Sequence, residues 1–90
     1  MELELMVGDI VVSLSGHDKN KIFIIVDIDK NGYLAIIDGK NRLKEQPKFK
    51  NPKHLLKLAH DDELIKKVNS PLATNAEIYR LLKAYKHIKE

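Results

Sequence analysis

The sequence predicts a mainly β domain with α-helix at its C-terminal end, namely a small five-stranded barrel followed by two short helices. Two observations predict this fold. Between Val7 and Asp38, runs rich in β-branched and aromatic residues alternate with polar turns that contain Gly, Asn or Asp. After residue 59, apolar residues recur instead at helical spacing. A meander of short strands cannot bury its apolar face alone, so we expect it to curl into a barrel.

The first three strands are expected at residues 10–12, 22–28 and 33–37. The second of these runs is almost continuously apolar, which is typical of a strand that is central or buried on both faces. Gly16 lies in the first loop, where a positive φ is expected, and residues 29–32 form a strong turn signal. Met1–Met6 alternates apolar and acidic residues, and we interpret it as an edge strand that continues towards Gly8.

The next segment is expected to complete the barrel. Asp38-Gly39 signals a turn, and a short strand should follow at residues 42–45. Two prolines then exclude a regular helix and favour extended backbone, so residues 46–53 are interpreted as an extended basic loop. A strand at about residues 54–58 should close the barrel, which gives a barrel domain at 1–58 and a helical appendage at 59–90.

The appendage contains two helical patterns. His60-Asp61-Asp62 should open a short helix that runs to about Val68, with its acids at the positive end of the helix dipole. Thr74 and Glu77 form a capping box that starts the second helix. We expect the apolar face of this second helix to pack on the barrel rather than to dock a protein partner. That face comprises Ile78, Leu81, Leu82, Tyr85 and Ile88.

Composition limits the classes of protein that the chain can belong to. Ninety residues make one small domain. The absence of cysteine excludes a disulfide framework and a thiolate zinc site. No apolar run approaches the roughly 20 residues that span a bilayer, and the acidic start is unlike a signal peptide. We therefore expect a cytoplasmic protein that is a monomer when free.

Positive charge is concentrated in one segment. Residues 1–39 hold three Lys against seven acids, whereas residues 40–57 hold six Lys and one Arg against Glu45 alone. Residues 58–90 are almost neutral, with six bases against five acids. A polyanion responds to such a local patch rather than to the modest net charge of +3. A solvated, lysine-rich surface loop is the simpler alternative explanation.

The same region carries a resemblance to a known family. Gly8-Asp9, Val11, the loop 15–21 and the run through Val26 resemble a KOW motif, the RNA-binding segment of SH3-like barrels in ribosomal proteins and NusG-type transcription factors. Asn20 stands where this loop commonly carries a second glycine, and Asn tolerates the positive φ that the turn needs. Further residues look like those of the eukaryotic-type large-subunit ribosomal KOW proteins (the fourteen-e group) and their short bacterial relatives. These are Ile25-Val26-Asp27, Asp29, Leu34, Asp38-Gly39, Arg42, Lys50 and Leu55.

The resemblance implies a non-catalytic RNA-binding protein with an SH3-like (KOW) barrel. Its partner would be RNA, in particular ribosomal RNA, with ribosomal proteins as further contacts and with a role in translation. The alternative is a protein–protein interaction module of the transcription or translation machinery, which would bind through an apolar patch and tolerate salt. Salt titration separates the two functions, because lysine–phosphate contacts release counterions.

The candidate RNA-binding residues lie in the loop 15–21 and the segment 40–54, which we expect to form one basic rim. They are His17, Lys19, Lys21, Lys40, Arg42, Lys44, Lys48, Phe49, Lys50, Lys53 and His54. Phe49 could stack on a base, but we favour its being a hydrophobic plug of the barrel, and Tyr33 is likewise read as core or rim packing. Replacing Lys48 and Lys50 by Ala is expected to weaken RNA binding without lowering the melting temperature.

The sequence shows no sign of catalysis. It contains no Ser-His-Asp pattern, phosphate-binding loop or nucleotide-binding fingerprint. The four histidines lack the spacing of metal ligands, and His60-Asp61-Asp62-Glu63 is better explained as an acidic helix cap than as a metal cluster. We expect no cofactor and no metal.

Overall fold

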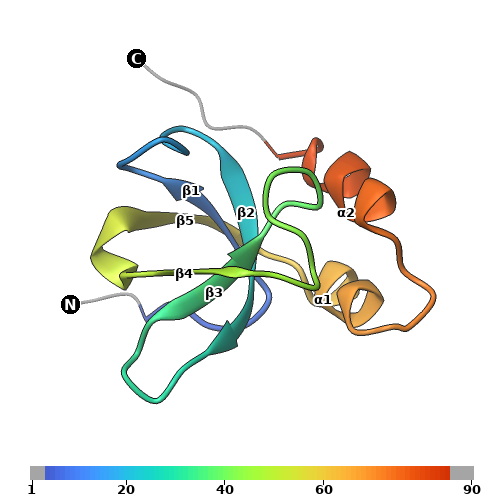
Figure 1. Ribbon diagram of the computed structural model, residues 1–90, viewed down its shortest axis with the longest axis horizontal. Helices are drawn as coiled ribbons and strands as arrows, with labels where there is room; N and C mark the ends of the chain where they lie inside the picture. Colours follow the sequence, from blue (N-terminus) through green and yellow to red (C-terminus); the bar gives the residue numbers. More distant parts are fainter. Residues whose placement is uncertain (1–3, 86–90) are drawn as a thin grey trace.

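The computed structural model describes residues 4–85, which form a five-stranded antiparallel sheet with two helices packed on it (Figure 1). The order of the strands in the sheet is β4-β3-β2-β1-β5. The strands are β1 (Asp9–Ser13), β2 (Ile22–Ile28), β3 (Leu34–Ile37), β4 (Lys48–Lys50) and β5 (Leu55–His60). The helices are α1 (Asp62–Val68) and α2 (Asn75–Leu82), and one 3-10 turn, η1 (Pro52–His54), joins β4 to β5. No helix within residues 4–85 is long and apolar enough to cross a membrane.

The predicted central position of β2 is confirmed. Its side chains alternate between two hydrophobic cores, as successive residues of a strand must. Phe23 and Ile25 pack with residues of β1, β3 and β5 inside the curve of the sheet. Ile24 points to the opposite face, where α1 and α2 cover it with Leu64, Ile78 and other apolar side chains. Both faces of the central strand are therefore buried.

The sheet is strongly bent but is not a closed barrel. β5 pairs with β1 rather than with β4, and β4 and β5 are the two edges of the sheet in the described part of the chain. The register shifts between Ile10 and Val11 and again between Ile25 and Asp27, and such bulges bend a strand and increase its twist. The expected closure by the last strand is therefore not seen. Along the chain, only Asn51 and the turn η1 connect these two edge strands.

Two expected strands are wrong. Residues 42–45 form no strand. The Asp38 carboxylate accepts the backbone N–H groups of Lys40, Asn41 and Arg42 at 2.8–2.9 Å, and the side chain of Asn75 accepts that of Lys44 (2.8 Å). The fourth strand begins only at Lys48. Residues 4–6 form no strand either, since Asp9 accepts the N–H of Met6 with its side chain (2.9 Å) and donates its own N–H to the Met6 carbonyl (3.0 Å), which makes a turn. The rest of the Met1–Met6 prediction lies outside the described residues.

The loop between β1 and β2 has the geometry that its sequence predicts. Gly16 adopts φ +82° and Asn20 adopts φ +72°, so Asn20 takes the left-handed conformation that Asn accepts more readily than most residues. The N–H of Asn20 donates to the carbonyl of Ser13 (2.8 Å), and that of Lys21 donates to the carbonyl of Asp18 (3.0 Å). These bonds hold the loop in one shape.

Both helices begin at side-chain caps. Asp61 accepts the N–H of Leu64 and Thr74 accepts the N–H of Glu77, so α1 starts at Asp62 rather than at the expected His60, which belongs to β5. The predicted apolar face of α2 packs on the sheet through the buried Ile78 and Leu82 and the half-buried Leu81 and Tyr85. Ile88 lies outside the described residues.

The approach of the β3–β4 loop to α2 gives a first test of the packing. Gly39 and Gly32 both have positive φ (+81° and +85°), but a Cβ on Gly39 would lie 2.2 Å from the carbonyl oxygen of Asn75, whereas a Cβ on Gly32 meets nothing within 4 Å. Gly32→Ala should cost about 1–2 kcal/mol for its backbone conformation alone. Gly39→Ala should cost about 1–3 kcal/mol more, because helix α2 must move away. Urea unfolding of the two variants checks this, and equal losses would contradict the packing.

Candidate nucleic-acid interface

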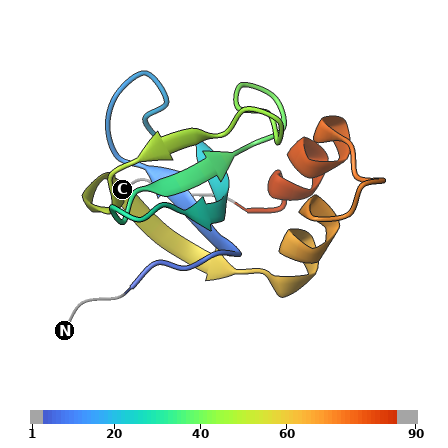
Figure 2. The same ribbon diagram turned by 60° about the horizontal axis from the view of Figure 1, so that its bottom comes forward.

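Two loops project from the same end of the sheet. The loop 14–21 joins β1 to β2 and the loop 38–47 joins β3 to β4, and in an antiparallel sheet these connections lie at one end (Figure 2). The predicted site residues of these loops are thus brought together, although they are about twenty residues apart in the sequence. The turn 29–33 lies at the other end of β3.

The buried Lys50 fastens β4 to the first loop. This lysine is only 8% exposed, and its Nζ donates to the hydroxyl of Ser13 (2.9 Å), the carbonyl of Ser15 (2.9 Å) and the carboxylate of Asp18 (2.7 Å). Lys48 lies at 3.4 Å from the other oxygen of that carboxylate. Burial raises the pKa of Asp18, but hydrogen bonds from Lys50 and Ser13, with the charges of Lys50 and Lys48, outweigh it and lower that pKa to about 2. Lys50 is thus a structural residue, whose ammonium group is engaged by contacts within the protein.

A second predicted residue, Lys44, also holds the fold together. Its Nζ donates to the carbonyl of Ala73 (2.7 Å) and approaches that of Ser70 (3.4 Å), both in the segment between α1 and α2. Its backbone N–H donates to the side chain of Asn75 (2.8 Å). The Asn75 side chain in turn donates to Glu45 (2.9 Å). These bonds attach the loop 38–47 to the start of α2.

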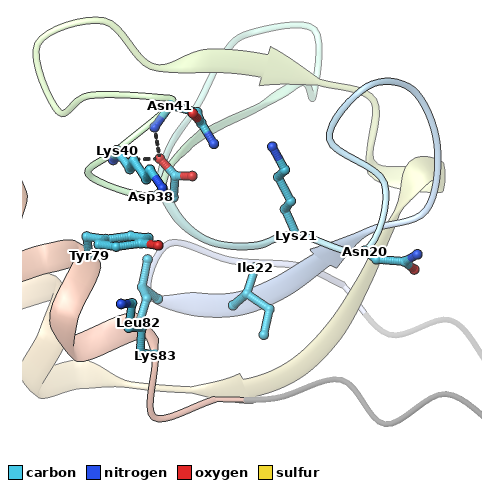
Figure 3. Close-up of a pocket in the computed structure, with 9 residues that line it drawn as sticks. All are labelled: Asn20, Lys21, Ile22, Asp38, Lys40, Asn41, Tyr79, Leu82 and Lys83. Atoms are coloured by element: carbon cyan, nitrogen blue, oxygen red, sulfur yellow. Dashed lines mark hydrogen bonds between the residues drawn. The ribbon is translucent and has the colours of Figure 1, made fainter.

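Lys21 and Lys40, one from each of the two loops, line a cleft against α2. This cleft has a volume of about 310 Å³, and Lys21, Lys40 and Lys83 line it together with Tyr79 (Figure 3). The ammonium groups of Lys40 and Lys83 lie 5.3 and 4.6 Å from the centre of the Tyr79 ring, within the range of cation–π attraction. Asp38 is the one acid among the described residues that line the cleft, and one of its oxygens already accepts three backbone N–H groups.

The other predicted site residues lie outside this cleft. His17, Lys19 and Lys53 are exposed, whereas Arg42 and His54 are half-buried. The backbone carbonyl of His54 accepts the N–H of Leu14 (2.8 Å), which ties η1 to the first loop. Lys53 lines a separate groove of about 830 Å³, whose floor is formed by Leu34, Leu55 and other apolar residues.

The two aromatic predictions differ in outcome. Phe49 is 49% exposed, so the expectation that it plugs the barrel is wrong. It lies on the edge strand β4 opposite Ala35 and belongs to neither of the two hydrophobic cores. Tyr33 is 42% exposed and precedes β3, which fits the expected rim position rather than the core.

Sequence reasoning missed Tyr79 and Lys83. The two are four residues apart on and just after α2, so their side chains share one face of the helix. That spacing is a readable signal, but it does not reveal that Lys40 of a distant loop meets the same ring. The contact depends on how α2 packs against the loop 38–47.

The expected acidic helix cap at residues 60–63 is borne out. Asp61 caps α1, and within residues 4–85 no group of three or more His, Asp and Glu side chains could hold a metal ion. His60 instead bonds Asp9 through Nδ1 (2.8 Å) and Asp62 through Nε2 (2.7 Å). Asp9 is fully buried and has Lys57 at 3.4 Å as a second cationic neighbour. The hydrogen bond to Asp9, followed by that to Asp62, raises the pKa of His60 above its usual value.

Comparison with known proteins adds no family assignment, since no protein-family model matches the chain and no curated protein matches it.

The buried position of Lys50 makes a prediction about stability. Replacing Lys50 by Met leaves the buried Asp18 carboxylate without its nearest cation, and breaking such a pair costs about 3–5 kcal/mol. Lys48→Met should cost less than about 1 kcal/mol, because its ion pair is longer and more exposed. Urea unfolding compares the two variants, and a Lys50→Met protein as stable as the wild type would contradict the assignment. The expectation that replacing both lysines leaves the melting temperature unchanged is therefore reversed.

His60 predicts a pH dependence of stability. Its pKa is raised on folding, so its contribution is fully present below the unfolded value of about 6.5 and is lost as the pH rises through the folded pKa. His60→Gln should remove this component from the free energy of unfolding, measured by urea titration between about pH 5 and about pH 9. His17→Gln, which alters an exposed loop residue, is the control. A His60→Gln profile parallel to that of the wild type would refute the role of the cluster.

Proposed function

We propose that the protein is a non-catalytic RNA-binding protein of the cytoplasm that associates with ribosomal RNA. It grips the phosphate backbone with a basic rim, defined here as Lys19, Lys21, Lys40, Arg42 and Lys48. The single observation that carries the proposal is the convergence of the loops 14–21 and 38–47 at one end of the sheet. In that arrangement, lysines from two separate segments are exposed at the same end of the sheet.

The pairing of charged side chains in this region supports a binding site for a polyanion. Among the described residues, no ion pair involves Lys19, Lys21, Lys40 or Arg42. The three acids of these loops are already engaged, since Asp18 bonds Lys50, Asp38 bonds three backbone N–H groups and Glu45 accepts a hydrogen bond from Asn75. The rim therefore keeps a net positive charge, and lysines that neutralise phosphates release counterions and gain affinity.

The strand order supports the finer assignment of the fold. A meander of four strands, with the fifth returning beside the first, is the order expected for an SH3-like sheet of the KOW type. The positive φ at Gly16 and at Asn20, which stands where the KOW loop commonly carries a second glycine, supports the resemblance to the KOW motif. We infer that the bent sheet is an open form of this barrel and that the motif loop faces RNA.

The alternative function is a protein-interaction module, and the apolar face of α2 was the first surface considered for it. The apolar face of α2 is covered by the sheet, with Ile78 and Leu82 buried. Binding of a protein in place of RNA would then have to use another surface and would tolerate salt, which is the outcome that distinguishes it in the experiment below.

The proposed function is tested by the salt dependence of binding to purified ribosomal RNA. The double variant Lys21→Gln/Lys40→Gln should bind more weakly, with the slope of log affinity against log salt reduced by about 0.7–0.9 for each lysine. Lys30→Gln is the matched control, because Lys30 lies in the turn at the opposite end of β3. Filter binding measures all three proteins. A double variant that is indistinguishable from Lys30→Gln would remove the rim from the site.

Association with the ribosome is tested separately in cell lysate. The tagged protein should sediment with a ribosomal subunit in a sucrose gradient at low salt and move to the top of the gradient at high salt. A protein that remains at the top at every salt concentration would refute the ribosomal part of the proposal. A protein that cosediments regardless of salt would favour a protein contact.

A further inference from the structure

We propose that the cleft between α2 and the two loops is a subsite for a single phosphate group, so that α2 is part of the interface rather than only a support for the sheet. This inference deepens the proposed function and rests on it for the source of the phosphate, which is RNA. The ligand chemistry is a phosphate oxyanion, either an internal phosphodiester or a terminal phosphomonoester. The residues that would bind it are Lys21, Lys40 and Lys83, with the hydroxyl of Tyr79.

Three segments that are far apart in the sequence supply these cations. Lys21 immediately precedes β2, Lys40 follows the Asp38-Gly39 turn and Lys83 follows the last residue of α2. Both Lys40 and Lys83 lie over the Tyr79 ring, so their nitrogens are no more than about 10 Å apart, which is about one Debye length at physiological salt. Like charges held this close repel each other, and an anion bound near both of them would offset that repulsion.

Tyr79 organises the cleft. Its ring attracts the ammonium groups of Lys40 and Lys83 and limits the freedom of these long side chains before any ligand arrives. Figure 3 shows the hydroxyl of Tyr79 directed into the space that Lys21 borders from the other side. A hydroxyl at this place can donate a hydrogen bond to a phosphate oxygen that the lysines hold by charge.

The frame of the cleft is fixed by backbone contacts. Gly39 packs so closely on α2 that a Cβ there would lie 2.8 Å from the backbone nitrogen of Tyr79. Asp38 holds the turn 40–42 through three hydrogen bonds. The helix that carries Tyr79 and the turn that carries Lys40 are thus held together, and a preformed site loses less entropy when it binds.

The size and charge of the cleft favour phosphate over other anions. A volume of about 310 Å³ is at the small end of ligand pockets, which suits one phosphate and part of its sugar but not a folded partner. Lysine binds phosphate as a point charge and does not need the planar pairing that arginine gives to carboxylates. Three lysines around one hydroxyl match the dispersed charge of a phosphate group.

The experiment follows the backbone amides of Lys40, Tyr79 and Lys83 by NMR during titration with three probes. The probes are inorganic phosphate, uridine 5′-monophosphate and an oligouridylate that lacks a terminal phosphate. Shifts with the oligonucleotide identify an internal phosphodiester as the ligand. Shifts with phosphate and the mononucleotide alone identify a terminal phosphomonoester. No shift of these amides with any probe would overturn the proposal.

Variants distinguish the contribution of the cleft to RNA binding from that of the whole basic rim. Lys83→Gln should weaken binding of the effective probe and reduce the salt slope on ribosomal RNA by about 0.7–0.9, whereas Lys66→Gln, on the exposed face of α1, should change neither. Tyr79→Phe keeps the ring and should cause a smaller loss than Lys83→Gln. If the wild type binds ribosomal RNA but Lys83→Gln behaves like Lys66→Gln, the cleft is refuted and the rim stands. If the mononucleotide binds but ribosomal RNA does not, the cleft stands and the proposed function fails.

Discussion

Phe23, Ile24 and Ile25 are buried one after another, so the central strand must be covered on both faces. The bent sheet covers one face by folding over Phe23 and Ile25. No strand is available for the other face, and the two C-terminal helices cover Ile24 instead. The helices are therefore required by the hydrophobic pattern of a strand that precedes them by about forty residues.

This constraint also determines the composition of the candidate site. Because α2 must lie against the sheet, its Tyr79 is brought beside the loop 38–47, where Gly39 leaves room for the helix backbone. The cleft lined by three lysines is a consequence of that packing. The lysines predicted to form the site then divide into two groups with different tasks. Lys44 and Lys50 hold loops to the fold, while Lys21 and Lys40 remain exposed.

Most of the local structure could be predicted from the sequence, because it depends on nearby residues. The central strand, the positive φ at Gly16 and Asn20, and the cap at Thr74 follow from patterns within a few positions. The expected strand at 42–45 is wrong because the N–H of Arg42 is bound by the Asp38 carboxylate and that of Lys44 by the side chain of Asn75, about thirty residues further along the chain. The sequence resemblance to KOW proteins remains the ground for expecting RNA, rather than another polyanion.

The candidate site was harder to predict, because it depends on contacts between distant segments. Lys50 is buried and bonds Ser13 and Asp18, whereas Lys48, two residues earlier, is half-buried. Nothing in the local sequence distinguishes these two lysines. The exposure of Phe49 was missed for a similar reason, since it depends on β4 being an edge strand.

The central claim is that RNA contacts the end of the sheet where the two loops meet α2. Ultraviolet cross-linking of the protein to ribosomal RNA, followed by mass spectrometry of the attached peptides, tests it most directly. The account predicts cross-linked peptides from residues 15–21, 38–50 and 75–83, with Tyr79 among the attachment sites. Cross-links confined to the turn 29–33 or to the groove beside η1 would contradict it.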